Sequence, residues 1–133
     1  MPALPYLNTP LTTIQDMVNQ AIANINASGG TFSGLVSGTA IAGTVTAQGT
    51  KLQITSEALV TAAAATYTLT ITDAAISASS SVFVAVNYGT ANAGEPGVHR
   101  VQPLAGSVVI NIRNDAAAAA FNGTLIINVL VVN

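Results

Sequence analysis

Few side chains in this sequence are suited to acid–base or nucleophilic chemistry. The single histidine, His99, lies near Glu95 and Arg100, while Asp115 and the serine run 79–81 offer a carboxylate and hydroxyl groups. A hydroxyl, an imidazole and a carboxylate make a catalytic triad when a fold brings them together. No G-x-S-x-G, H-E-x-x-H or phosphate-binding loop motif occurs to support such roles. We therefore expect no enzymatic activity, and we interpret His99 as a surface or interface residue.

Metal binding has equally little support in the spacing of the residues. The chain has no cysteine and one histidine, and its carboxylates share no spacing typical of metal ligands. These carboxylates stand at Asp16, Glu57, Asp73, Glu95 and Asp115. We expect Asp73 to end a strand and Asp115 to cap a turn. The sequence predicts neither a metal site nor a cofactor.

Two tyrosines raise the alternative of a carbohydrate-binding surface. Tyr67 and Tyr88 lie in predicted strands, where exposed rings would form a stacking platform of the kind found in lectins. Aromatic residues are only 5% of the chain and tryptophan is absent, so a sugar would find little to stack on. We favour a core or interface position for Tyr88.

Charged residues are unusually scarce in this chain. They make up 6% of it, against about 25% in ordinary soluble domains, whereas hydrophobic residues make up 50%. A monomer stays soluble through surface charge, so a chain nearly without it is expected to cover its surface with copies of itself or with a partner. The fixed cations are only Lys51, Arg100 and Arg113, too few to neutralise a run of phosphates. Oligomerisation is expected, and nucleic acid is not an expected partner.

Targeting and membrane segments are not predicted. Residues 1–10 lack a basic region followed by an apolar stretch, so they do not resemble a signal peptide. Thr, Ser, Asn or Gly interrupts every apolar run before it reaches about 18 residues, the length that a membrane helix needs. We expect a protein that is made and kept in a cytosol and has no membrane span.

The first ten residues are predicted to form an extended arm. Pro2, Pro5 and Pro10 fix the backbone φ angle and discourage both helix and sheet. The arm also carries apolar side chains that suit docking on another surface, namely Leu4, Tyr6 and Leu7. A tail without fixed structure is the alternative.

A short amphipathic helix is predicted over residues 11–27. Its apolar residues recur at alternating steps of three and four, the spacing of a coiled-coil seam. They are Leu11, Ile14, Val18, Ala21 and Ile25. Thr12 and Gln15 suit a capping box, and Gly29 and Gly30 supply a stop. Because Met17 and Ile22 widen the stripe, three helices around a common axis would use it best; packing of this helix against its own sheet is the alternative.

The rest of the chain is predicted to be β structure. Residues 28–50 are rich in Gly, Ser and Thr but too apolar for a solvated linker, so we expect short strands packed on neighbouring subunits. Alternating patterns then predict strands over 51–55, 67–72, 82–88, 98–102, 107–113 and 124–132. The last is nearly all apolar and should be central. The fold expected is mainly β: an antiparallel, jelly-roll-like β-sandwich over residues 31–133, preceded by an arm and oligomerisation helix over 1–30.

The second half of the chain resembles a known kind of protein. It contains a Thr-rich strand that ends in ITD at residues 71–73, then AGSVVINIRN at 105–114 and the turn NGT at 122–124. From about residue 66 to the C-terminus, this succession resembles the C-terminal β-domain of small virion proteins of tailed bacteriophages. The resemblance implies a β-sandwich that serves as a capsid decoration (cement) protein, a head fibre or a tail-associated protein, commonly as a trimer.

These observations give one leading functional hypothesis and two alternatives. We expect a non-enzymatic, trimeric capsid decoration protein, which binds itself and the major capsid protein on the virion surface after assembly in the host cytoplasm. Leu4, Tyr6 and Leu7 are the expected capsid-docking residues, and the helical seam is the expected trimer interface. The alternatives are a head- or tail-fibre module and a sandwich that binds a carbohydrate on the host surface.

Overall fold

The computed structural model describes residues 16, 18, 19 and 34–133. The chain divides into two units, residues 1–33 and 34–133. The predicted arm and most of the predicted helix lie outside the described residues. Asp16, Val18 and Asn19 are described individually with helical backbone geometry, and the side chain of Val18 is 53% exposed. These three described residues do not establish an element, so the helix and its seam remain predictions.

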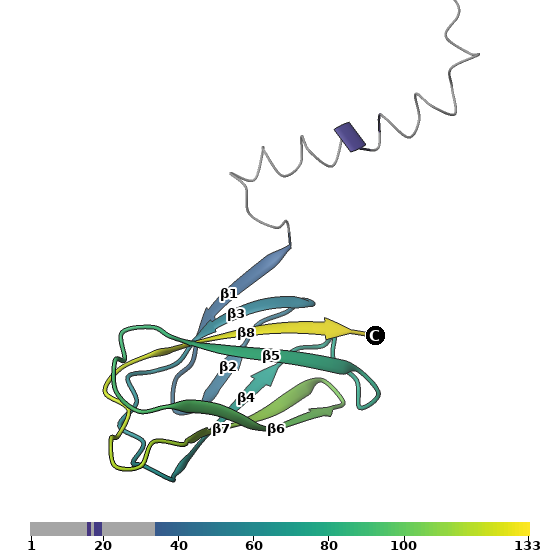
Figure 1. Ribbon diagram of the computed structural model, residues 1–133. Coiled ribbons are helices and arrows are strands. Elements are labelled where there is room, and N and C mark those ends of the chain that lie inside the picture. Colours follow the sequence, from purple (N-terminus) through teal and green to yellow (C-terminus); the bar gives the residue numbers. More distant parts are fainter. Residues whose placement is uncertain (1–15, 17, 20–33) are drawn as a thin grey trace, which may run out of the picture. The chain divides into compact units, whose positions relative to one another are not determined.

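Residues 34–133 fold into two four-stranded sheets that pack against each other as a β-sandwich (Figure 1). The strands are β1 (Leu35–Thr39), β2 (Thr44–Thr46), β3 (Lys51–Thr55), β4 (Thr66–Thr72), β5 (Ser81–Tyr88), β6 (Pro96–Leu104), β7 (Ser107–Asn114) and β8 (Leu125–Val132). One sheet, which we call sheet A, has the order β1-β3-β8-β5, and the other, sheet B, has the order β2-β4-β7-β6. The prediction of a mainly β sandwich is confirmed.

Both sheets are mixed, so the expectation of a purely antiparallel, jelly-roll-like sandwich is wrong in this respect. β1 pairs with β3 in parallel, and β2 pairs with β4 in parallel, whereas the other four strand pairs are antiparallel. The cause is the path of the first four strands, which alternate between the two sheets. Each crossing reverses the chain, so strands two apart in sequence run in the same direction and meet side by side.

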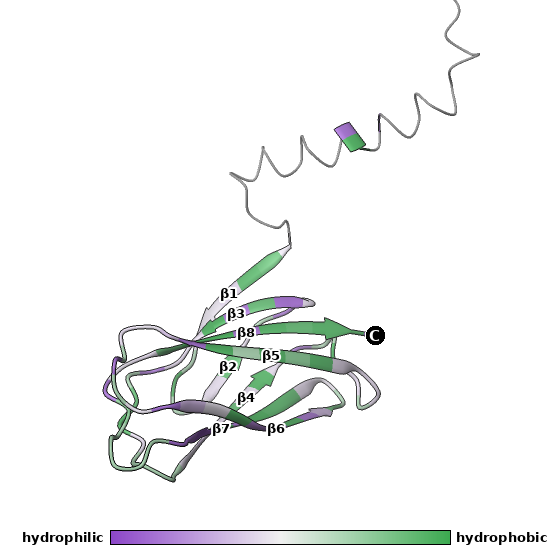
Figure 2. Ribbon diagram, in the orientation of Figure 1, coloured by the Kyte–Doolittle hydropathy of each residue, from purple (hydrophilic) through white to green (hydrophobic). Residues whose placement is uncertain are grey.

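The core lies between the sheets and follows the period of two that a half-buried strand requires. In β4 the inner residues are Tyr67, Leu69 and Ile71, while the threonines between them face outward. In β8, the alternate residues from Leu125 to Val131 are buried, and most of the strand is hydrophobic (Figure 2). β8 lies between β3 and β5, which confirms its predicted central place.

The remaining strand predictions also agree closely with the structure. β3 has the predicted bounds, and β4 to β8 differ from theirs by one or two residues at their ends. The glycine-rich stretch supplies the short strands β1 and β2, which pair with β3 and β4 of the same chain; their predicted packing on neighbouring subunits stays a prediction. Residues 116–120 form a loop. Among the described residues, no helix has the length and apolar character needed to cross a membrane.

Candidate functional site

The fold brings together some of the residues with acid–base potential, but not the serines. His99, on β6, has its Nε2 at 3.0 and 3.1 Å from the two carboxylate oxygens of Asp115. Arg113 Nε lies 3.8 Å from the same carboxylate, and both partners of the His99 pair are well exposed. The serine candidates lie elsewhere, with Ser80 Oγ donating a hydrogen bond to Asn133 Oδ1. The arrangement is a solvent-exposed contact between a histidine and a carboxylate, and such surface contacts contribute about 0–1 kcal/mol to stability.

The contact between His99 and Asp115 lies beside an irregularity in β6. The register of β6 against β7 shifts between Val98 and Arg100, so His99 is the bulged residue. A Cβ at Gly97 would collide with the Asp115 carboxylate, so the glycine leaves the space in which Asp115 reaches His99. The sequence prediction that Asp115 caps a turn is wrong. The cap is supplied by Asn114, whose Oδ1 accepts the Ala116 backbone N–H at 3.1 Å.

Asn114 is the most fully bonded buried polar group of the described chain, and sequence reasoning missed it. Its side chain is 0% exposed at the end of β7. Its Oδ1 also accepts the backbone N–H of Glu95 at 3.0 Å, and its Nδ2 donates to the carbonyls of Thr61 at 3.0 Å and Ala119 at 2.8 Å. One amide thereby joins three loops at the same end of the sandwich. An asparagine at the end of an apolar strand is a common pattern, so nothing in the sequence indicated this role.

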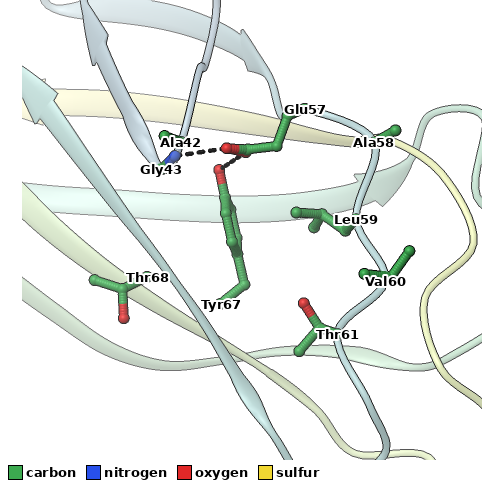
Figure 3. A pocket seen from close by; sticks show the side chains of 9 residues that line it. All are labelled: Ala42, Gly43, Glu57, Ala58, Leu59, Val60, Thr61, Tyr67 and Thr68. Carbon is green, nitrogen blue, oxygen red and sulfur yellow. Dashed lines mark hydrogen bonds between the residues drawn. The ribbon is translucent and has the colours of Figure 1, made fainter.

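A shallow pocket of about 360 Å³ lies where the loop after β3 approaches β4 (Figure 3). Glu57 lies at its rim and accepts two hydrogen bonds, one from the Gly43 N–H at 2.5 Å and one from the hydroxyl of Tyr67. Gly43 has φ of 75°, and a Cβ there would lie 2.6 Å from the Thr68 carbonyl oxygen. The carboxylate therefore fixes the turn between β1 and β2 against β4.

Both members of the Glu57–Tyr67 pair have shifted pKa values. For Glu57, burial alone would raise the pKa, but hydrogen bonds from Tyr67 and Gly43 outweigh it, so the pKa lies below its ordinary value of 4.5. For Tyr67, burial and then the neighbouring Glu57 carboxylate raise the pKa well above its ordinary value of 10.0. The stable arrangement is a neutral phenol that donates to an ionised carboxylate.

Replacing Tyr67 with phenylalanine is expected to lower the free energy of unfolding at neutral pH by about 1.5–3 kcal/mol, the usual contribution of a hydrogen bond to a charged group. Because the folded-state pKa of Glu57 is lowered, the contribution is present above pH 4.5 and is lost as the pH falls through the folded value. Because the folded-state pKa of Tyr67 is raised, the stabilisation from this hydrogen bond also declines as the pH rises above 10.0. Urea unfolding at a series of pH values measures the difference in unfolding free energy between the wild-type protein and Tyr67→Phe.

Tyr88→Phe is the matched control, since its hydroxyl donates to a neutral backbone carbonyl, that of Gly94, at 2.5 Å. The effect of Tyr88→Phe on the free energy of unfolding should stay constant through the acid range. If the difference in unfolding free energy between wild type and Tyr67→Phe is equally constant through the acid range, the Tyr67 hydroxyl does not stabilise the fold through the Glu57 carboxylate.

The two tyrosines do not make a shared carbohydrate platform. Tyr67 is buried on the inner face of β4 in sheet B, and Tyr88 lies on β5 in sheet A. The hydroxyl of Tyr88 holds the loop between β5 and β6 through Gly94. Tyr88 is 48% exposed, so it is not a core residue, and its predicted place in an interface stays a prediction.

The outer face of sheet A carries a patch of exposed apolar side chains. The registers place Leu35 beside Lys51, Lys51 beside Leu130, and Leu130 beside Phe83, in one row across all four strands. Val132 extends the row along β8. The exposed fractions are 45% for Leu35, 60% for Phe83, 43% for Leu130 and 47% for Val132. We call these four residues the apolar patch.

The outer face of sheet B is rich in threonine. Thr66, Thr68, Thr70 and Thr72 point outward from β4, and the parallel register places Thr44 and Thr46 of β2 beside the last two. On the far side of β4, the register continues the face with β7 residues such as Asn111 and Arg113. Both outer faces are therefore poor in charge, one of them hydroxylated and the other partly apolar.

The sequence-predicted interface residues are not placed by the structure, because Leu4, Tyr6, Leu7 and all of the seam except Val18 lie outside the described residues. Within residues 16, 18, 19 and 34–133, no three His, Cys, Asp or Glu side chains gather closely enough to hold a metal ion. No protein-family model matches the chain, and no curated protein or solved structure matches it either.

Proposed function

We propose that this chain is a non-enzymatic structural protein of a virus particle, a trimeric decoration protein that binds the outer surface of the capsid. The observation that carries the proposal is the apolar patch on a sandwich whose outer faces carry few charges, with Lys51 standing in the row of the patch. Exposed apolar patches of this kind mark surfaces that bind other proteins. A surface with so little charge gains affinity from shape-matched contact rather than from long-range attraction.

The roles of the charged and buried polar residues also support a structural function. Glu57 fixes a turn, Asn114 joins loops, and His99 pairs with Asp115 beside a bulge. Each of these groups has a partner that accounts for its position in the fold. The resemblance of residues 66–133 to phage virion β-domains supports the placement on a capsid, and the predicted seam of residues 11–25 supports the trimer.

Decoration is expected to work through repeated weak contacts. Each trimer presents three copies of the arm with Leu4, Tyr6 and Leu7, and linking weak sites in this way raises the overall affinity by orders of magnitude. No single contact then has to be strong. The capsid surface supplies the matching repeat, because its subunits stand in a symmetric lattice.

Capsid binding tests the proposal. Purified full-length protein added to undecorated expanded capsids of its own virus should bind in saturable numbers divisible by three, and high salt should leave the binding intact because few charges contribute. Deleting residues 1–9 should lower the occupancy while the sandwich stays folded by circular dichroism. Sedimentation of capsids with bound protein measures both results.

The matched control is a variant with Leu4, Tyr6 and Leu7 changed to serine, which keeps the length of the arm and removes only its apolar contacts. This variant, like the deletion, should lower the occupancy of the capsid while the sandwich stays folded. Protein that never binds capsids but labels host cells would replace this proposal with the host-surface alternative.

A further inference from the structure

β5 is an edge strand whose outward-pointing backbone groups have no backbone partner among the described residues. Gly89, directly after β5, donates its N–H to the Thr124 carbonyl at 2.9 Å, which marks a hydrogen-bonded pair in the register with β8. Such pairs alternate along antiparallel strands, so the odd-numbered residues of β5 direct their backbone groups toward β8. The N–H and C=O groups of Val82, Val84 and Val86 therefore point toward the open edge.

The other sheet edges carry features that discourage pairing with another chain, and β5 does not. β6, the long edge of sheet B, contains Pro96, Pro103, a bulge and the charged Arg100. β1 and β2 are only five and three residues long. β5 has eight residues with no proline, no charge and no shift in its register with β8. Short length, proline, charge and bulges are the means by which proteins protect sheet edges, so among the strands of residues 34–133 β5 is the edge that suits a partner strand.

The sequence of β5 is complementary to itself. In an antiparallel pair, side chains on the same face must meet, so the outward residues Ser81, Phe83, Ala85 and Asn87 have to oppose one another. A register centred on Val84 places the large Phe83 opposite the small Ala85 and leaves room for the ring. It also pairs polar Ser81 with polar Asn87, and Val82 with Val86. No like charges meet, because the strand carries none.

We propose that β5 pairs with β5 of a second copy of this chain about a two-fold axis through Val84, joining two copies of sheet A into one continuous sheet. Such a contact is isologous, with the same strand contributed by both copies. The Phe83 members of the apolar patch lie next to this junction and become covered on pairing. A three-fold axis has no isologous contacts, so this interface links copies that belong to different trimers. It goes beyond the proposed decoration function and does not depend on the predicted helix.

A single cysteine at Val84 tests the register directly, since the natural chain has none. A hydrogen-bonded antiparallel pair separates its Cα atoms by about 5.5 Å, which lies within the range of about 4.4–6.8 Å that a disulfide spans. Under mild oxidation, most chains of full-length Val84→Cys should run as covalent dimers on a non-reducing gel. Val82→Cys is the matched control, because its two copies would stand about 13 Å apart along the strands and should stay uncrosslinked.

A second variant tests the contact without any crosslink. Ala85→Lys places a charge opposite Phe83 of the second copy and should weaken association between trimers at least tenfold by sedimentation velocity, whereas Thr68→Lys on the outer face of sheet B should leave it unchanged. Crosslinking of Val82→Cys as efficient as that of Val84→Cys, or none at either site, overturns the inference. Crosslinked dimers without trimers would uphold it and contradict the proposed trimer instead.

Discussion

Replacing Asn114 with alanine is expected to lower the free energy of unfolding by about 3 kcal/mol or more, because it removes four hydrogen bonds at once. The backbone N–H groups of Glu95 and Ala116 and the carbonyls of Thr61 and Ala119 would lose the partner that joins them. A buried polar group without a partner costs about 1–3 kcal/mol, and loop movement toward water recovers part of that. Urea denaturation followed by circular dichroism measures the loss.

Asn111→Ala, on the same strand but on the outer face, is the matched control and should change stability by less than about 1 kcal/mol. Asn114→Asp should also destabilise the protein, because an oxygen replaces the Nδ2 that donates to Thr61 and Ala119. Equal effects of Asn111→Ala and Asn114→Ala would contradict the role given to this amide.

The double variant Ile14→Asp with Val18→Asp is expected to abolish the trimer while the sandwich stays folded. Two unpaired charges on each predicted helix would have to be buried at the seam, at a cost of several kcal/mol. The sandwich, which contains residues 34–133, has its own core and does not include these positions. Light scattering should report a mass no larger than that of one two-fold pair, with an unchanged β signal by circular dichroism.

Asn19→Asp with Gln20→Asp is the matched control for this variant. It adds the same number of charges outside the predicted seam and should leave the trimer intact. Loss of the β signal together with the trimer in Ile14→Asp/Val18→Asp would mean that the helix belongs to the core of the sandwich.

The strands of the sandwich were predictable because their residues alternate clearly. β4 places threonine on one side and large apolar residues on the other, and this pattern has only one arrangement with a dry interior. β8 was predicted to be central for a related reason, since an almost wholly apolar strand needs neighbours on both sides. The local pattern contains the information that decides which face is buried.

The parallel or antiparallel direction of strand pairing was not predictable from the same alternating patterns. β1 and β2 are short, and nothing in their residues indicates that they cross between sheets and pair in parallel. The partners of Asn114 and Glu57 were equally hidden, since each bonds to backbone groups far away in sequence. Such contacts depend on which loops lie next to each other, and that arrangement follows from the topology of the whole fold.

The apolar patch was predictable only in part. The low charge of the chain predicted that its surface binds other copies or a partner, but only the registers show that Leu35, Leu130 and Phe83 share a row across sheet A. Composition indicates that an interaction surface exists. The strand order then locates it.

The most direct test of the decoration function is to image intact virus particles that carry this protein. We expect three-fold symmetric density on the outer capsid surface, into which three copies of the sandwich fit, and we expect that density to vanish from particles made without the chain. Density confined to the tail, or particles from which the protein is absent altogether, would contradict it.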